Sequence, residues 1–282
     1  MLSKLLKYEF KATARIFLLT YGALVALALV NAGLITLRTT SSALSGSSLY
    51  GLATTLMMML YGLAAVAVVI VTLIIILVRF YRMLGDEGHL WFTLPVTATQ
   101  HILSKLIVAF VWMIASLVVV IASVALVVLP TAWYQHLGSV GSSWNALVAQ
   151  GFNPGAWTVV VLALLVISLV CSILEYYAAM AIGPNLLKSR LGGSVLTYVI
   201  FYFALELINL GVLMVLSFGV SGKFSNINFA ISDTGMLSTE TASAINRLVS
   251  TTSLTVGVEY LVLAVVFFCL ARYFMTRKLN LA

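Results

Sequence analysis

The chain has 282 residues, of which 62% are hydrophobic and only 8% are charged, whereas soluble domains carry about 25% charged residues. This composition excludes a soluble globular protein, because too few charged side chains are present to cover a water-exposed surface. The net charge of +7 does not indicate a nucleic-acid-binding protein either, since the basic residues gather at the ends of apolar stretches.

The chain begins with a segment in which basic residues recur at helical spacing. Lys4, Lys7, Lys11 and Arg15 fall on one side of a helix, and apolar residues occupy the other side. We therefore predict an amphipathic helix over residues 1–16 at the membrane surface, with its basic face against anionic lipid headgroups or an acidic partner. The alternative interpretation is a simple basic flank of the first membrane span.

Six apolar stretches follow that are long enough to cross a bilayer, which takes about 20 residues in a helix. We predict an all-α integral membrane protein with a single transmembrane domain over residues 1–282. The first stretch is longer than the apolar core of a signal peptide, so we interpret it as an uncleaved span. The predicted spans are residues 17–37, 54–78, 106–129, 157–180, 195–216 and 254–274.

The distribution of Lys and Arg predicts the orientation of these spans, because basic residues near span ends tend to stay in the cytoplasm. The N-terminal segment, the second and fourth connections and the C-terminus together hold 12 of the 15 basic residues. The other three are Arg38, Lys223 and Arg247. We therefore expect both termini to face the cytoplasm.

The connection between the second and third spans is the most unusual segment of the chain. It exceeds twenty residues, whereas connections within helical bundles are usually about 2–8 residues long. It also places aromatic residues beside an acidic pair, which favours a cytoplasmic docking surface; an aromatic belt at the lipid headgroups is the alternative. The residues of this candidate surface are Gly85, Asp86, Glu87, Gly88, Trp91, Phe92, Leu94 and Pro95.

The connection between the fourth and fifth spans is short and carries glycine at both ends, Gly183 and Gly193. We expect one or two helical turns within it. Its basic residues, Lys188 and Arg190, form a second candidate contact for the same cytoplasmic partner.

The connections on the opposite side of the membrane are polar or rich in small residues. Residues 38–53 are rich in Ser, Thr and Gly, and residues 131–156 hold Trp133, Tyr134 and Trp144. Residues 239–249 have helical propensity, so we expect a small external or re-entrant helix there. None of these connections is long enough for a separate folded domain.

Three carboxylates lie inside the predicted spans, where ionisable groups are costly and often functional. Counting about 1.5 Å per residue, Glu206 lies near the middle of the membrane, Glu175 near the cytoplasmic end of its span and Glu259 near the outer end of its span. We take Glu206, Asn209 and Glu175 as candidate cavity residues. The alternative is a structural hydrogen bond, for example between Glu206 and Asn209 one turn away.

Motifs for catalysis or metal binding are missing from the sequence. It contains no phosphate-binding loop, no His-Glu-x-x-His and no Gly-x-Ser-x-Gly. Its two cysteines lie in separate apolar stretches, without the spacing of a metal site. We therefore expect no catalytic residue, no metal and no cofactor on this chain.

Three motifs resemble those of permease subunits of the ATP-binding-cassette type 2 exporters, particularly the small six-span bacterial permeases. Together with the six spans, the resemblance covers nearly the whole chain, although Pro184 stands where that family usually has a polar residue. The first motif, Leu5–Lys11, resembles the family's opening helix. The second resembles its first cytoplasmic loop and consists of Gly85–Gly88, Phe92–Pro95 and Ser104–Lys105. The third, Ala181–Gly183, resembles its second cytoplasmic loop.

The resemblance implies a type V exporter in the bacterial cytoplasmic membrane. Two permease chains, identical or different, would form the substrate path at their interface, and each would dock on a separate cytoplasmic ATPase subunit that binds ATP and magnesium. Residues 85–95 would form the coupling helix, with Asp86 and Glu87 paired to basic residues of the ATPase or to Arg82. The absence of a phosphate-binding loop fits this division, and the substrate stays open.

Two other functions remain open at this point. One is a proton-coupled secondary transporter with Glu206 as the proton site, although the internal repeats and interrupted helices of such folds are not evident. The other is a membrane anchor or sensor that binds a cytoplasmic partner without transport. Substitution of Asp86 and Glu87 together distinguishes the first from an ATP-driven exporter.

Overall fold

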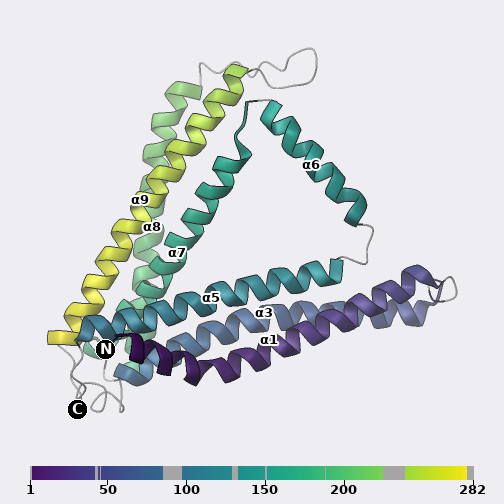
Figure 1. Ribbon diagram of the computed structural model, residues 1–282. Coiled ribbons are helices and arrows are strands. Elements are labelled where there is room, and N and C mark those ends of the chain that lie inside the picture. The colour runs from purple at the N-terminus through teal and green to yellow at the C-terminus, as the bar shows by residue number, and fades with distance from the viewer. Residues whose placement is uncertain are drawn as a thin grey trace. The chain divides into compact units, whose positions relative to one another are not determined.

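The computed structural model of the chain describes residues 2–41, 44, 46–84, 97–128, 133–149, 151–187, 189–224 and 239–277. No residue in these ranges forms a strand, and six helices are long and apolar enough to cross a membrane, which confirms an all-α, multi-pass membrane protein. The elements are α1 (Leu2–Thr40), α3 (Ser48–Leu84), α5 (Ala98–Val128), α6 (Trp133–Ala149), α7 (Pro154–Ile182), the 3-10 helix η1 (Gly183–Asn185), α8 (Arg190–Phe224) and α9 (Thr239–Arg277) (Figure 1).

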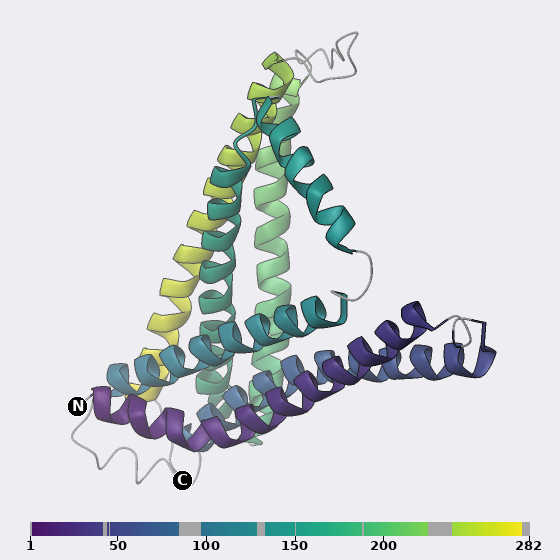
Figure 2. The same cartoon turned by 45° about the vertical axis from the view of Figure 1, so that its right-hand side comes forward.

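The chain forms two compact units, Met1–Ser139 and Val140–Ala282. In the first unit, α1, α3 and α5 each pack against the other two. In the second unit, α7 packs against both α8 and α9, and η1 packs against α7 and α8. Figure 2 shows the long helices of each unit running alongside one another. Each unit therefore contributes three helices of spanning length.

Five of the six predicted spans lie within one long helix each, and each of these helices extends beyond its span. The third predicted span, residues 106–129, coincides with α5 as far as Val128, and residue 129 lies outside the described residues. In α9 the extension covers residues 239–249, so the small separate helix expected there is instead the beginning of α9. The hydroxyls of Ser250 and Thr251 donate hydrogen bonds to the carbonyl of Arg247, at 2.9 and 2.7 Å. These bonds satisfy the polar side chains within the helix, so a polar stretch does not end it. The helix α6 was not expected from the sequence.

The N-terminal residues form the first turns of α1 and are not a separate helix. The buried positions of α1 recur every three or four residues and extend without a break from the N-terminal segment into the span. The amphipathic helix expected over residues 1–16 is therefore not set apart from the span. The buried positions are Glu9, Thr13, Phe17, Tyr21, Leu24, Ala28 and Asn31.

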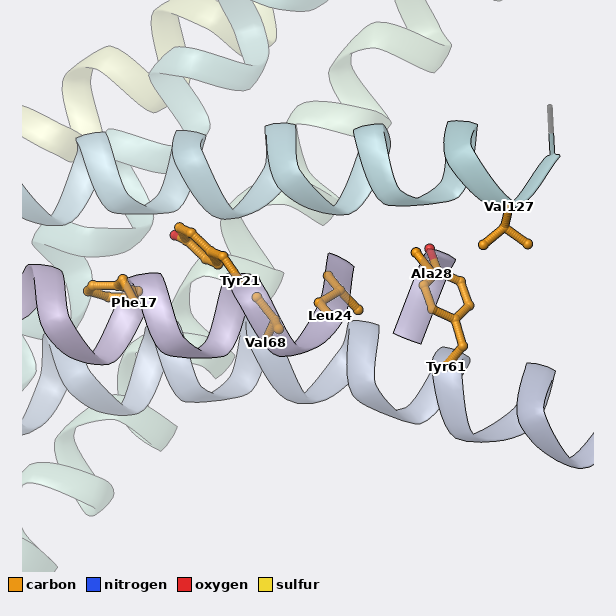
Figure 3. Packing of buried hydrophobic residues seen from close by; sticks show 7 residues of the cluster. All are labelled: Phe17, Tyr21, Leu24, Ala28, Tyr61, Val68 and Val127. Atoms are coloured by element: carbon orange, nitrogen blue, oxygen red, sulfur yellow. The ribbon is translucent and has the colours of Figure 1, made fainter. Parts of the chain in front are cut away.

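The apolar core of the first unit lies between α1, α3 and α5 and is crossed by hydrogen bonds between side chains (Figure 3). The Tyr21 hydroxyl lies 2.7 Å from the Ser116 hydroxyl, which lies 2.8 Å from that of Thr72. Further along, the hydroxyls of Tyr61 and Ser123 lie 2.8 Å apart. In a membrane such bonds contribute about 0.6 kcal/mol each on average, and here they fix the register of the three helices.

Candidate functional site

The predicted coupling segment lies outside the described residues, but the two helices that flank it do not. The helix α3 ends at Leu84 and α5 begins at Ala98, so the structure places both ends of the connection. The candidate residues that fall outside the described part are Gly85, Asp86, Glu87, Gly88, Trp91, Phe92, Leu94, Pro95 and, in the other cytoplasmic connection, Lys188.

A buried carboxylate joins these two helices. Oε2 of Glu9, from α1, pairs with Nη2 of Arg79 at 2.6 Å, and Oε1 pairs with Nζ of Lys105 at 2.9 Å. Arg79 lies near the end of α3 and Lys105 near the beginning of α5. Glu9 is only 3% exposed and Lys105 only 6%. The ion pairs therefore tie α3 and α5 to α1 on both sides of the predicted coupling segment.

The turn after Glu9 extends this cluster by hydrogen bonds. The Thr13 hydroxyl donates to the Glu9 backbone carbonyl at 2.9 Å and accepts from Nε1 of Trp112, also at 2.9 Å. The Trp112 ring stacks on Phe17, with centroids 4.3 Å apart. This aromatic contact connects α5 to α1 a second time, and its Phe17 belongs to the apolar core.

This cluster is not evident as a site in the sequence. Glu9 lies within the opening motif, Lys105 belongs to a motif that resembles the first cytoplasmic loop, and both Arg79 and Lys105 are among the basic residues that predict the orientation of the spans. One feature pointed to it: Glu9 is the first acidic residue of the chain and lies four and eight residues before Thr13 and Phe17, so it shares their helix face.

The candidate cavity residues of the second unit differ in exposure. Glu206 is exposed on α8, whose most apolar window contains no buried residue. Within the described residues it has no hydrogen bond or ion pair with Asn209 or Glu175. The Glu206–Asn209 hydrogen bond considered as the alternative is therefore not formed. Glu175, on α7, is partly buried.

Glu259 is the enclosed carboxylate of this unit. Both of its carboxylate oxygens are buried and have no hydrogen-bond partner within the described residues. It interacts electrostatically with Cys171 of α7, as does Glu175. Glu206, which the sequence places near the middle of the membrane, is exposed on α8, whereas the carboxylate oxygens of Glu259 are buried. Position along a helix does not determine which face of that helix is packed.

The connection between α7 and α8 is built around a close approach of two glycines. A Cβ at Gly183 would collide with the backbone of Ser194, and a Cβ at Gly193 would collide with the carbonyl of Gly183. The chain forms η1 here, which confirms the expected helical turn, and α8 begins at Arg190. The end of α7 and the beginning of α8 are therefore in direct backbone contact beside the candidate contact residue Arg190.

The described part of the chain contains no group of three or more His, Cys, Asp or Glu that could hold a metal ion. Comparisons of the chain with models of protein families, with curated proteins and with solved structures gave no match.

Proposed function

We propose that this chain is the membrane permease subunit of an ATP-driven exporter of the ATP-binding-cassette type, with the type V architecture. It lies in the bacterial cytoplasmic membrane with both termini in the cytoplasm. The chain is not an enzyme: ATP and magnesium bind to separate cytoplasmic ATPase subunits. Support comes from the six spanning helices, the resemblance in three motifs and, above all, the two ion pairs of Glu9.

The Glu9 ion pairs meet a mechanical requirement of such a machine. An ATPase outside the membrane must move helices inside it, through a segment that it contacts. Residues 85–96 connect α3 to α5, so a displacement of this segment acts on Arg79 and Lys105 through short lengths of helix. Because both cations pair with one carboxylate on α1, the three helices respond together.

The exposed carboxylate of α8 is evidence for the proposal that a second permease chain packs against this one. Glu206 lies among exposed apolar side chains, including Phe203, Leu207 and Leu210. A carboxylate that faces hydrocarbon is costly, and in membrane proteins such groups usually face a bundle interior or a polar path. A second copy or a related chain on this face of α8 would provide that environment, with the substrate path between the two chains.

A proton-coupled transporter is the second candidate, and Glu259 favours it. A buried carboxylate with no hydrogen-bond donor is costly to retain, and within membranes such groups mark proton or ion pathways. In this case Glu259, rather than Glu206, is the proton site, and transport by the isolated chain responds to a pH gradient.

The two candidates are distinguished by purifying the tagged chain in mild detergent and identifying what copurifies. The exporter proposal expects a polypeptide with a phosphate-binding loop in stoichiometric amount, and vanadate-sensitive ATP hydrolysis by the complex.

Asp86→Asn with Glu87→Gln should uncouple or release the ATPase. The matched control, Asp233→Asn with Glu240→Gln, removes the same charge between the fifth and sixth predicted spans and should leave the complex intact. Transport by the chain alone would overturn the exporter proposal.

A further inference from the structure

A groove lies between α1 and α3 beside the Glu9 cluster. Its volume is about 470 Å³, which is within the range of small-molecule sites, about 300–1,000 Å³. Ile16 of α1 and Ile74 and Val78 of α3 form apolar walls, and all three are exposed. Arg79, Arg82 and Lys105 line the same groove.

The charge of this groove is not balanced within the described residues. Three cations line the groove, and two of them, Arg79 and Lys105, pair with the carboxylate of Glu9. Arg82 is exposed and forms no ion pair with any residue that the structure describes. Among the described residues, the groove therefore carries a net positive charge, and Arg82 presents a guanidinium group there.

The apolar and charged parts follow one another along α3. Ile74 and Val78 lie in the apolar stretch of the span, and Arg79 and Arg82 lie at its end. At about 1.5 Å per residue, the distance from Ile74 to Arg82 along the helix is roughly 12 Å. The groove thus changes from apolar to cationic in the direction from the membrane interior to its surface, as an anionic phospholipid does from chain to headgroup.

We propose that this groove binds one anionic phospholipid, with its phosphate at Arg82 and Arg79 and an acyl chain along Ile16, Ile74 and Val78. The site is independent of the transport proposal, since it needs only a chain embedded in a membrane. The lipid would complete the charge balance of the cluster that joins α1, α3 and α5. A free anion does not account for the apolar walls.

Native mass spectrometry of the purified, delipidated full chain tests the site. We expect one dioleoyl phosphatidylglycerol to bind at least about fivefold more tightly than dioleoyl phosphatidylcholine. Arg82→Gln should weaken phosphatidylglycerol binding about fivefold, which is the contribution of one basic residue near an anionic membrane surface. The matched control is Arg15→Gln, because Arg15 is exposed on α1 beside Ile16 but does not line the groove. Its effect should stay below about twofold.

The walls are tested with a second pair of variants. Ile74→Trp fills the groove and should abolish the bound lipid, whereas Val69→Trp, at an exposed position on another face of α3, should leave it. Equal binding of the two lipids, or equal effects of Arg82→Gln and Arg15→Gln, would overturn the proposal. So would competition by inorganic phosphate or by glycerophosphoglycerol at the lipid's own concentration, because either would show a site for a free anion.

Discussion

Glu9 and Lys105 lie 96 positions apart in the sequence and form a buried ion pair of 2.9 Å between α1 and α5. Both residues are at most 6% exposed, so their charges are stabilised by each other rather than by water. A buried ion pair adds little net stability, but the loss of one partner leaves a buried charge without compensation. The cluster therefore determines how α1 sits against its neighbours more than how stable the unit is.

We expect Glu9→Gln to lower the thermal stability of the detergent-purified chain. The substitution leaves Lys105 buried and Arg79 partly buried without their carboxylate, and breaking a buried pair in this way costs about 3–5 kcal/mol. Differential scanning fluorimetry measures the shift. Glu206→Gln is the matched control, because Glu206 is exposed and unpaired within the described residues, and its melting temperature should stay close to that of the unchanged chain.

The double variant Glu9→Met, Lys105→Met should be more stable than Glu9→Met alone. Glu9→Met alone leaves the buried ammonium group of Lys105 without the Glu9 carboxylate, whereas the double variant removes both charges of the pair. Apolar replacements of a buried ion pair are often neutral or stabilising. A double-mutant cycle of melting temperatures gives the coupling between the two positions. Additive effects would show that the two side chains do not depend on each other, contrary to their 2.9 Å contact.

Gly183→Ala should destabilise the second unit, whereas Gly211→Ala should not. A methyl group at Gly183 would meet the backbone of Ser194, which no side-chain rotation relieves, while nothing lies within 4 Å of a Cβ at Gly211. Alanine also has a helix propensity about 1 kcal/mol better than glycine, so Gly211→Ala should be neutral or stabilising. Yield of monodisperse protein in gel filtration and the melting temperature both report the difference. Equal behaviour of the two variants would contradict the close glycine contact.

The spans could be predicted from the sequence because crossing a bilayer requires only length and apolar composition. The helix ends could not be predicted in this way. Polar residues such as Ser250 and Thr251 would ordinarily indicate a connection, but their hydroxyls bond to Arg247 within the helix. The continuity of α1 through residues 2–16 has a related origin, since Glu9 and Thr13 continue the buried face of the span.

The Glu9 cluster was beyond sequence reasoning for a different reason. Basic residues near span ends orient a membrane protein. Because this role is sufficient to explain Arg79 and Lys105 in the sequence, their ion pairs with Glu9 could not be predicted. Whether Arg79 and Lys105 meet headgroups or a carboxylate depends on contacts between helices that are far apart in the chain. The same holds for Glu206 and Glu259: position along a helix is readable from the sequence, but the face that the neighbouring helix covers is not.

Glu259→Leu should raise the melting temperature of the chain. Its two carboxylate oxygens are buried without a hydrogen-bond partner in the described ranges, and an unsatisfied buried polar group costs about 1–3 kcal/mol. An apolar side chain of similar size removes that penalty, and Glu206→Leu is the control at an exposed position of α8. A fall in melting temperature comparable to that of Glu9→Gln would show that Glu259 is paired. If Glu259→Leu is more stable but loses transport, Glu259 is retained for its function although it destabilises the chain. Such a trade-off between stability and activity is common at functional sites.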